Sequence, residues 1–121
     1  MKVGDLHWVR MPGSGGHAQA GRRPAIVMQS EAAQNLPTVL IIPLTTQLSA
    51  VRFPGTVLIE ATAQNGLKQN SVALTFQMTA IDRTFIESAL GEISSTALAA
   101  VWQAFDLVTE QIGRASCRER V

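Results

Sequence analysis

The residues best suited to chemistry lie in a glycine-rich stretch between Pro12 and Pro24, which ends in Arg22 and Arg23. A guanidinium is always charged, and its planar fork of N–H donors fits the oxygens of a phosphate. Pro24 fixes the backbone directly after Arg23, where a strand is expected to begin, so this arginine should be held on a rigid edge. Arg23 is therefore a candidate for binding a phosphate and stabilising a phosphorane-like transition state.

The glycines of this stretch do not form a nucleotide-binding loop. The motif GxxxxGK[ST] is absent, and the stretch precedes a strand. We interpret the glycines as a source of backbone flexibility.

Short strands separated by turn residues are expected to position the arginine. We predict strands at Val3–Arg10, Pro24–Met28, Thr38–Ile42, Thr56–Glu60 and Ser71–Met78. The segment Thr38–Ile42 is rich in β-branched residues and continuously apolar, which favours a central strand buried on both faces. Five strands at this spacing predict a small β-barrel.

One long helix is predicted near the end of the chain. Ser94 or Ser95 can cap it, and one apolar stripe follows at helical spacing, formed by Leu98, Val101, Trp102, Phe105 and Val108. We interpret Trp102 and Phe105 as core residues, with a dimer contact as the alternative. Asp82 is expected to cap a second, short helix that runs through Phe85 and ends at Gly91.

Length and composition predict one soluble, cytoplasmic domain. The chain has 121 residues, and no apolar run approaches the roughly 18 residues needed to span a bilayer. We assign residues 1–111 to the domain and interpret residues 112–121 as the translation of a sequencing adapter; a natural basic tail is the alternative. Without that tail the chain has seven basic and eight acidic residues and no cysteine, which excludes disulfides and thiolate metal sites.

Charge is divided unevenly along the chain. Between Leu6 and Ile59 there is one glutamate, Glu31, against four arginines, which are Arg10, Arg22, Arg23 and Arg52. The segment from Ala61 to Gln111 is acidic by a similar margin. The basic half also contains the glycine-rich stretch, as a site for a polyanion would require; scattered surface arginines are the alternative interpretation.

Several motifs, in order and spacing, resemble those of the MazF/PemK toxins. They are Gly4–Val9, Gly16–Val27, Ile42–Thr46, Gly66–Leu74 and Gln77 with Ile81 and Asp82, and together they span nearly all of residues 1–111. The resemblance implies an SH3-like β-barrel with a C-terminal helix. It also implies a homodimer that cuts single-stranded RNA at selected sequences without a metal or other cofactor.

The resemblance assigns catalytic roles to Arg23 and Thr45, although Thr45 taken alone would be read as a cap at a strand end. The RNA itself would supply the nucleophile, its 2′-hydroxyl, and the expected products are a 2′,3′-cyclic phosphate and a 5′-hydroxyl end. The RNA-binding candidates are Gln19, Arg22, Thr46, Arg52 and Gln77.

Two positions depart from the family pattern. Ala18 stands where the family usually has glutamate, so we assign a role in proton transfer or substrate binding to the adjacent His17, whose unperturbed pKa of about 6.5 suits it. Phe76 stands where many members have aspartate; we interpret it as a core residue, with stacking on a base as the alternative. His7 is interpreted as structural.

The resemblance also predicts a partner. This is an antitoxin whose extended, acidic C-terminal segment occupies the RNA groove, which suits the basic half of the chain. Two alternative functions remain open from sequence: a gyrase-binding toxin of the CcdB type, which would lack the segment Gln19–Pro24, and a degenerate relative that binds RNA or antitoxin without cleavage.

Overall fold

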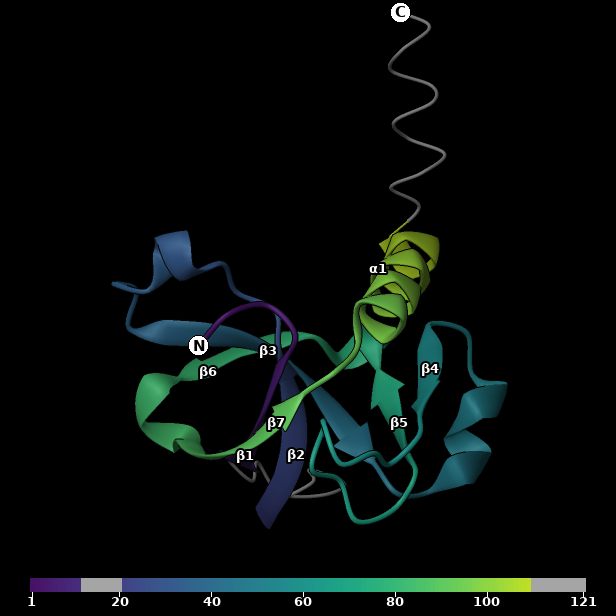
Figure 1. Cartoon of the computed structure of the whole chain (residues 1–121). Coiled ribbons are helices and arrows are strands. Elements are labelled where there is room, and N and C mark those ends of the chain that lie inside the picture. The colour runs from purple at the N-terminus through teal and green to yellow at the C-terminus, as the bar shows by residue number, and fades with distance from the viewer. Residues whose placement is uncertain (12–20, 110–121) are drawn as a thin grey trace, which may run out of the picture.

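The computed structural model describes residues 1–11 and 21–109, which fold into one mainly β unit with a helix at its end (Figure 1). The strands are β1 (Asp5–Met11), β2 (Gly21–Val27), β3 (Thr38–Thr45), β4 (Thr56–Ile59), β5 (Ser71–Leu74), β6 (Thr79–Asp82) and β7 (Ile86–Glu92). The helix α1 spans Ser95–Thr109, and four 3₁₀ turns are η1 (Glu31–Ala33), η2 (Leu48–Arg52), η3 (Thr75–Gln77) and η4 (Arg83–Phe85). The predicted fold class is confirmed. His17, Gln19 and residues 112–121 lie outside the described residues.

All strand pairs are antiparallel, and β3 is the central strand of the sheet. The strands follow the order β4-β5-β3-β2-β1-β7, with β6 beside the first half of β3. Residues Thr38–Ile41 pair with β6, whereas Leu44 and Thr45 pair with β5. The predicted central strand is therefore confirmed, and it continues three residues further, to Thr45. The helix α1 lies across one end of this curved sheet, beside β4 (Figure 1).

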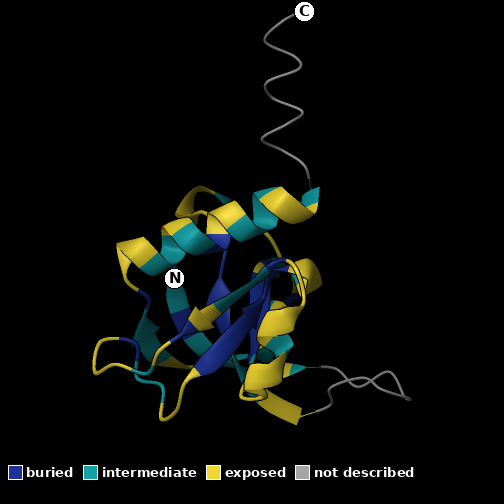
Figure 2. Cartoon of the chain, turned by 90° about the vertical axis from the view of Figure 1, so that its right-hand side faces the viewer, coloured by how far each residue is buried: buried dark blue, intermediate teal, exposed yellow. Residues whose placement is uncertain are grey.

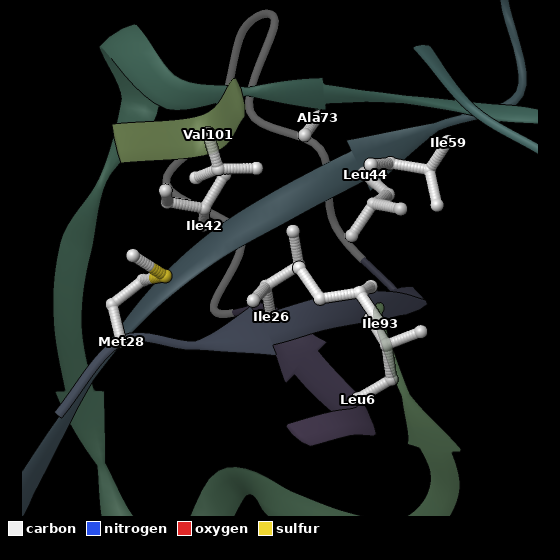
Figure 3. Packing of buried hydrophobic residues seen from close by; sticks show 9 residues of the cluster. All are labelled: Leu6, Ile26, Met28, Ile42, Leu44, Ile59, Ala73, Ile93 and Val101. Carbon is white, nitrogen blue, oxygen red and sulfur yellow. The ribbon is translucent and has the colours of Figure 1, made fainter. Parts of the chain in front are cut away.

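The core consists of two apolar clusters on opposite faces of β3. Ile42 and Leu44 belong to the larger cluster, and Val39 and Ile41 belong to the smaller one, as expected when successive side chains of a strand point to opposite faces. The larger cluster, shown in Figure 3, contains Leu6, Ile26, Met28, Ile42, Leu44, Ile59, Ala73, Ile93 and Val101. Because apolar side chains of β1, β2 and β3 are buried in this core, the alternate side chains at the ends of these strands must point outward.

Two predicted elements differ from the structure. The last predicted strand ends at Leu74, because the buried hydroxyl and amide of Thr75 both donate to the carbonyl of Gly55 and turn the chain into η3. The short helix predicted after Asp82 is wrong. Asp82 does cap a turn, since its carboxylate accepts from the amide of Thr84 at 2.9 Å, but the turn ends at Phe85. Residues from Ile86 onward pair with β1 as β7, so long-range pairing overrides local helix signals.

The helix α1 begins as predicted but covers less of the core than its stripe suggests. The Ser94 hydroxyl accepts from the amide of Ala97 at 3.1 Å, which confirms Ser94 as the cap. Most of the helix is coloured as intermediate or exposed (Figure 2). Val101 is its one buried residue, whereas the predicted core residue Trp102 is 39% exposed. Trp102 instead meets the half-buried Phe105 edge to face, with ring centroids 6.2 Å apart. No helix within residues 1–11 and 21–109 is long and apolar enough to cross a membrane.

Candidate active site

A cavity of about 550 Å³ opens where β1, β2 and β3 meet the segment between β4 and β5. This volume falls within the usual range for small-molecule and nucleotide sites. Most of its lining comes from β1, β2, the end of β3 and the segment before β5. The lining residues are Trp8, Arg22, Arg23, Pro24, Leu44, Thr45, Thr46, Gln47, Gly66, Leu67, Lys68, Gln69, Ser71 and Leu90. Four predicted site residues, Arg22, Arg23, Thr45 and Thr46, therefore line one cavity.

Arg23 and Thr45 come from neighbouring strands. β2 and β3 pair with Ala25 opposite Pro43, and this register, continued by two residues, sets Arg23 across from Thr45. Arg23 lies within β2, two residues after its start, so the expectation of a rigid scaffold holds. Partial burial lowers the pKa of its guanidinium, which nevertheless stays charged at neutral pH. A half-buried cation is thus held beside a hydroxyl at the cavity wall.

The Thr45 side chain acts as the predicted strand-end cap as well as lining the cavity. Its Oγ1 accepts a hydrogen bond of 3.2 Å from the amide of Gln47, two residues further on. This contact orients the hydroxyl by using one of its acceptor positions, and the hydroxyl proton is left to donate elsewhere. The two roles of Thr45 are therefore compatible.

A tightly bonded segment forms the wall opposite β2. The buried side chain of Asn65 accepts from the amides of Thr62 and Leu67, both at 3.0 Å, and donates to the carbonyl of Glu60 at 2.8 Å. Gly66 follows with φ of +71°, and a Cβ there would stand 2.2 Å from the carbonyl oxygen of Leu90. Only glycine permits this approach to β7, so the turn at Asn65 and Gly66 positions Lys68 and Gln69 at the cavity.

The rim of the cavity carries a charged cluster that the sequence analysis missed. The Arg22 guanidinium lies 4.3 Å from the centre of the Trp8 ring, and its Nε donates to Glu87 at 2.6 Å. The Arg10 Nε lies 3.8 Å from the other oxygen of Glu87. We call Trp8, Arg10, Arg22 and Glu87 the charged rim. No local signal in the sequence identified Glu87, because the opposition of Arg10 and Arg22 and the pairing of β7 with β1 are set by the fold.

Two predicted RNA-binding residues, Arg52 and Gln77, do not line the cavity. Arg52 lies in η2 with its guanidinium 5.0 Å from the centre of the Phe53 ring. Gln77 borders a second, largely apolar hollow of about 640 Å³. The other residues of that hollow form what we call the apolar face: Phe53, Pro54, Phe76, Leu107 and Val108.

The prediction that Phe76 belongs to the core is wrong. Its side chain is 43% exposed and meets the similarly exposed Phe53 edge to face, with centroids 6.3 Å apart. The turn η3 carries Phe76 outward, because Thr75 and not Phe76 points into the core at this position. Stacking on a base and contact with another protein surface are both compatible with this exposure.

The remaining site predictions have these outcomes. The structural interpretation of His7 is supported, since its Nδ1 donates to the carbonyl of Glu87 at 2.9 Å. Within residues 1–11 and 21–109, no three His, Cys, Asp or Glu side chains are grouped as ligands for a metal ion. His17 and Gln19 are not among the described residues.

Comparison with known proteins points to one family. A profile of PemK-like, MazF-like toxins of type II toxin–antitoxin systems matches residues 2–109. Endoribonuclease EndoA of Bacillus subtilis is 30% identical over 84 residues, which are 69% of this chain and 72% of EndoA. MazF of Deinococcus radiodurans has the same fold, with a TM-score of 0.74 at 26% identity over 91% of this chain and 96% of that one. The MazE–MazF complex of that organism matches with a TM-score of 0.70 at 25% identity and the same coverage.

Proposed function

The chain belongs to the PemK-like, MazF-like toxins of type II toxin–antitoxin systems, and from that premise we propose that it is an endoribonuclease that cuts single-stranded RNA at selected sequences. The observation that carries the proposal is that Arg23 and Thr45 line one cavity from neighbouring strands. The gyrase-binding alternative is not favoured, because EndoA is named an endoribonuclease and the segment Gln19–Pro24 is present.

The chemistry follows from what RNA supplies. The 2′-oxygen attacks the adjacent phosphorus, and the bond from phosphorus to the 5′-oxygen breaks, which leaves a 2′,3′-cyclic phosphate and a 5′-hydroxyl. The 2′-hydroxyl loses its proton to a base and the departing 5′-oxygen gains one, so no water or metal is consumed in this step. His17 is our candidate for proton transfer, and DNA, which lacks the 2′-hydroxyl, is not cut.

Arg23 and Thr45 supply the stabilisation. We assign to Arg23 the non-bridging phosphate oxygens, whose negative charge grows in the transition state, because its fork of donors matches them. Thr45 donates its hydroxyl proton to the same group, since Gln47 already occupies an acceptor position of that oxygen. Trp8, Lys68 and Gln69 border the same cavity and offer a ring, a cation and an amide to the neighbouring nucleotides.

We propose that a second copy of this chain covers the apolar face. Leu107 is 66% exposed there, and Val108, Phe53 and Phe76 are each exposed by more than 40%, a concentration that marks interfaces in soluble proteins. MazF of Deinococcus radiodurans has been solved as a complex with MazE. We place the acidic segment of a cognate antitoxin in the cavity, where it would pair with the arginines that bind RNA. We also place the protein in the cytoplasm.

The direct test is replacement of Arg23. Arg23→Ala should lower the rate of RNA cleavage by about 100-fold or more, because removing one donor to a developing oxyanion has effects of that size. Arg23→Lys should recover a small part of the rate, since it restores the charge without the fork. The assay is gel analysis of a mixed-sequence RNA with EDTA present and with end-group mapping.

The matched control is Arg83→Lys. The Arg83 guanidinium donates to the carbonyls of Gln34 and Leu36, away from the cavity, and lysine can replace those bonds. This variant should cut RNA at the normal rate. Failure of the unmodified protein to cut any RNA would overturn the proposal, and an RNA-binding protein without catalysis would then be the correct description.

A further inference from the structure

The charged rim contains a like-charge pair that the fold must neutralise. Arg10 and Arg22 stand directly opposite each other in the β1–β2 ladder, a placement that is unfavourable for two cations. The carboxylate of Glu87 reaches both of them, at 2.6 Å from Arg22 Nε and 3.8 Å from Arg10 Nε. Glu87 comes from β7. Because β1 lies between β7 and β2, the Glu87 side chain reaches across β1 to Arg22.

An irregularity in β7 places Glu87 there. His7 pairs with Ala89 and Val9 pairs with Ile86, so three steps along β7 match two steps along β1. Such a bulge adds a residue and redirects the side chains next to it. His7 donates to the carbonyl of Glu87 at 2.9 Å, which fixes the backbone of the bulge from its other side. The position of the carboxylate is therefore built into the strand pairing.

The contacts of Arg22 hold its side chain in place, but a ligand can replace them. Its guanidinium lies over Trp8 in a cation–π contact at 4.3 Å, and its Nε is bonded to Glu87. The side chains of Arg10, Arg22 and Glu87 are 62%, 51% and 31% exposed, so water and salt reach all three. Exposed ion pairs are weak, and a phosphate oxygen can take the place of the carboxylate.

We propose that Glu87 limits the affinity of the RNA site for every sequence, acting as an internal competitor for RNA phosphate at Arg22 and Arg10. The inference rests on the proposed function, because it concerns the strand of RNA that enters the cavity beside Arg22. A phosphate that takes the Nε donor of Arg22 must displace Glu87, and this cost weakens binding of every sequence equally. The ratio of affinities between sequences is therefore unchanged.

The test uses Glu87→Gln, which keeps the size of the side chain and removes its charge. Glu92→Gln is the matched control, because Glu92 lies on the same strand as Glu87. This substitution also removes the charged partner of a cation, since Lys2 lies 2.6 Å from Glu92, but Lys2 does not line the cavity. The probe is a labelled single-stranded DNA of about 12 nucleotides, which binds without being cut. Binding is measured at several salt concentrations between about 50 and 300 mM.

Glu87→Gln should bind the DNA more tightly at low salt, by about 3- to 10-fold. The slope of log affinity against log salt should steepen by about 0.7 for each additional phosphate that is neutralised, or about 1.4 if both arginines engage. Adding Arg22→Gln to this variant should remove most of the increase in affinity. Glu92→Gln should behave like the unmodified protein.

Cleavage supplies the second readout. At protein concentrations below saturation, Glu87→Gln should cut the preferred and the secondary sites of a mixed-sequence RNA faster by the same factor, with the single-turnover rate at saturating protein changed by less than about 3-fold. Unchanged DNA affinity and salt slope, or an equal increase in affinity for Glu92→Gln, would overturn the inference. If no RNA is cut by any variant but the DNA results hold, the proposed function fails while the role of Glu87 as competitor at a polyanion site stands.

Discussion

The charged rim and the apolar face are two exposed clusters of opposite chemistry, and they are supported in opposite ways. At the rim, exposed arginines are held by a carboxylate and a ring from the same chain. At the apolar face, Phe53 and Phe76 contact each other, while Leu107 and Val108 are exposed near the end of α1. The rim is thus complete within one chain, whereas the apolar face needs a partner to be covered.

The supporting elements differ in the same way. The rim is formed by β1, β2 and β7, which are joined by ladders along most of their length. The apolar face is assembled from the loop after η2, from η3 and from the last turns of α1. Ladder pairing fixes both the register of the strands and the direction of their side chains, which favours a precisely positioned site, whereas a surface for another protein needs mainly apolar area.

The largest effect should come from placing a charge in the apolar face. Leu107→Asp should weaken self-association by at least about 100-fold, because an unpaired charge buried at an interface costs several kcal/mol, roughly 3 to 5. The measurement is mass by sedimentation or light scattering across a concentration series. Leu36→Asp is the control, since Leu36 is also exposed, at 51%, but lies in the loop before β3. Equal masses for the two variants would contradict the assignment of the dimer surface.

A second variant acts on the wall of the cavity and leaves the apolar face intact. Gly66→Ala should lower the free energy of unfolding by about 1–3 kcal/mol, because φ of +71° is strained for alanine. The contact of its Cβ with the Leu90 carbonyl adds to that strain. Urea denaturation measures the loss.

Gly21→Ala separates the two causes. Gly21 also has a positive φ, +108°, but among the described residues nothing lies within 4 Å of a Cβ built there. Gly21→Ala should therefore lose only the stability that its positive φ costs, whereas Gly66→Ala also loses the part due to the clash. A loss for Gly66→Ala that stays below about 1 kcal/mol would mean that the close approach to β7 does not support the wall.

The smallest effect is expected from a group of charges that belongs to neither region. Hydrogen bonds from Lys2 lower the pKa of Glu92. Partial burial raises the pKa of Asp5, but hydrogen bonds from Lys2 outweigh it and the net pKa is lowered. The same contacts raise the pKa of Lys2. Lowered carboxyl pKa values stabilise the fold above the unfolded values of about 4, and this contribution is lost as pH falls through the folded pKa values. The raised pKa of Lys2 acts in the opposite sense and is lost only above about pH 10.4.

This group can be followed by comparing the unmodified protein with Lys2→Ala. The difference in their free energies of unfolding should be small and constant from about pH 5 to pH 10 and should shrink below about pH 4. Urea titrations at a series of pH values measure it. A difference that changed between about pH 6 and pH 8 would mean that another titrating group depends on Lys2.

The sequence predicted the residues of the cavity better than those of its surroundings. Arg23 and Thr45 were identifiable because each ends a recognisable motif next to a strand. Glu87 was not, because its partners are 65 and 77 positions away and meet it only through the pairing of β7 with β1. The same pairing converted the predicted helix after Asp82 into a strand. Local patterns carry no direct information on such contacts.

The exposed aromatic residues show a second limit. Trp102 lies on a correctly predicted apolar stripe, and Phe76 lies in the part of the predicted strand Ser71–Met78 that the structure replaces with η3; both are exposed. Periodicity indicates which side of an element is apolar, but not whether the covering surface belongs to the same chain. For Trp102 the core interpretation was wrong, and the alternative of a dimer contact stays a prediction.

The wall of the cavity also bears on how such a protein can change over generations. The segment between β4 and β5 is joined to β7 through main-chain atoms: Gly66 packs on the Leu90 carbonyl, and the amide of Glu92 donates to the carbonyl of Gln64 at 3.2 Å. These contacts do not depend on the side chains of Lys68 or Gln69, which are exposed and border the cavity. Mutations at these two positions can therefore accumulate without disturbing the wall, so descendants of this protein can acquire new preferred RNA sequences on an unchanged scaffold.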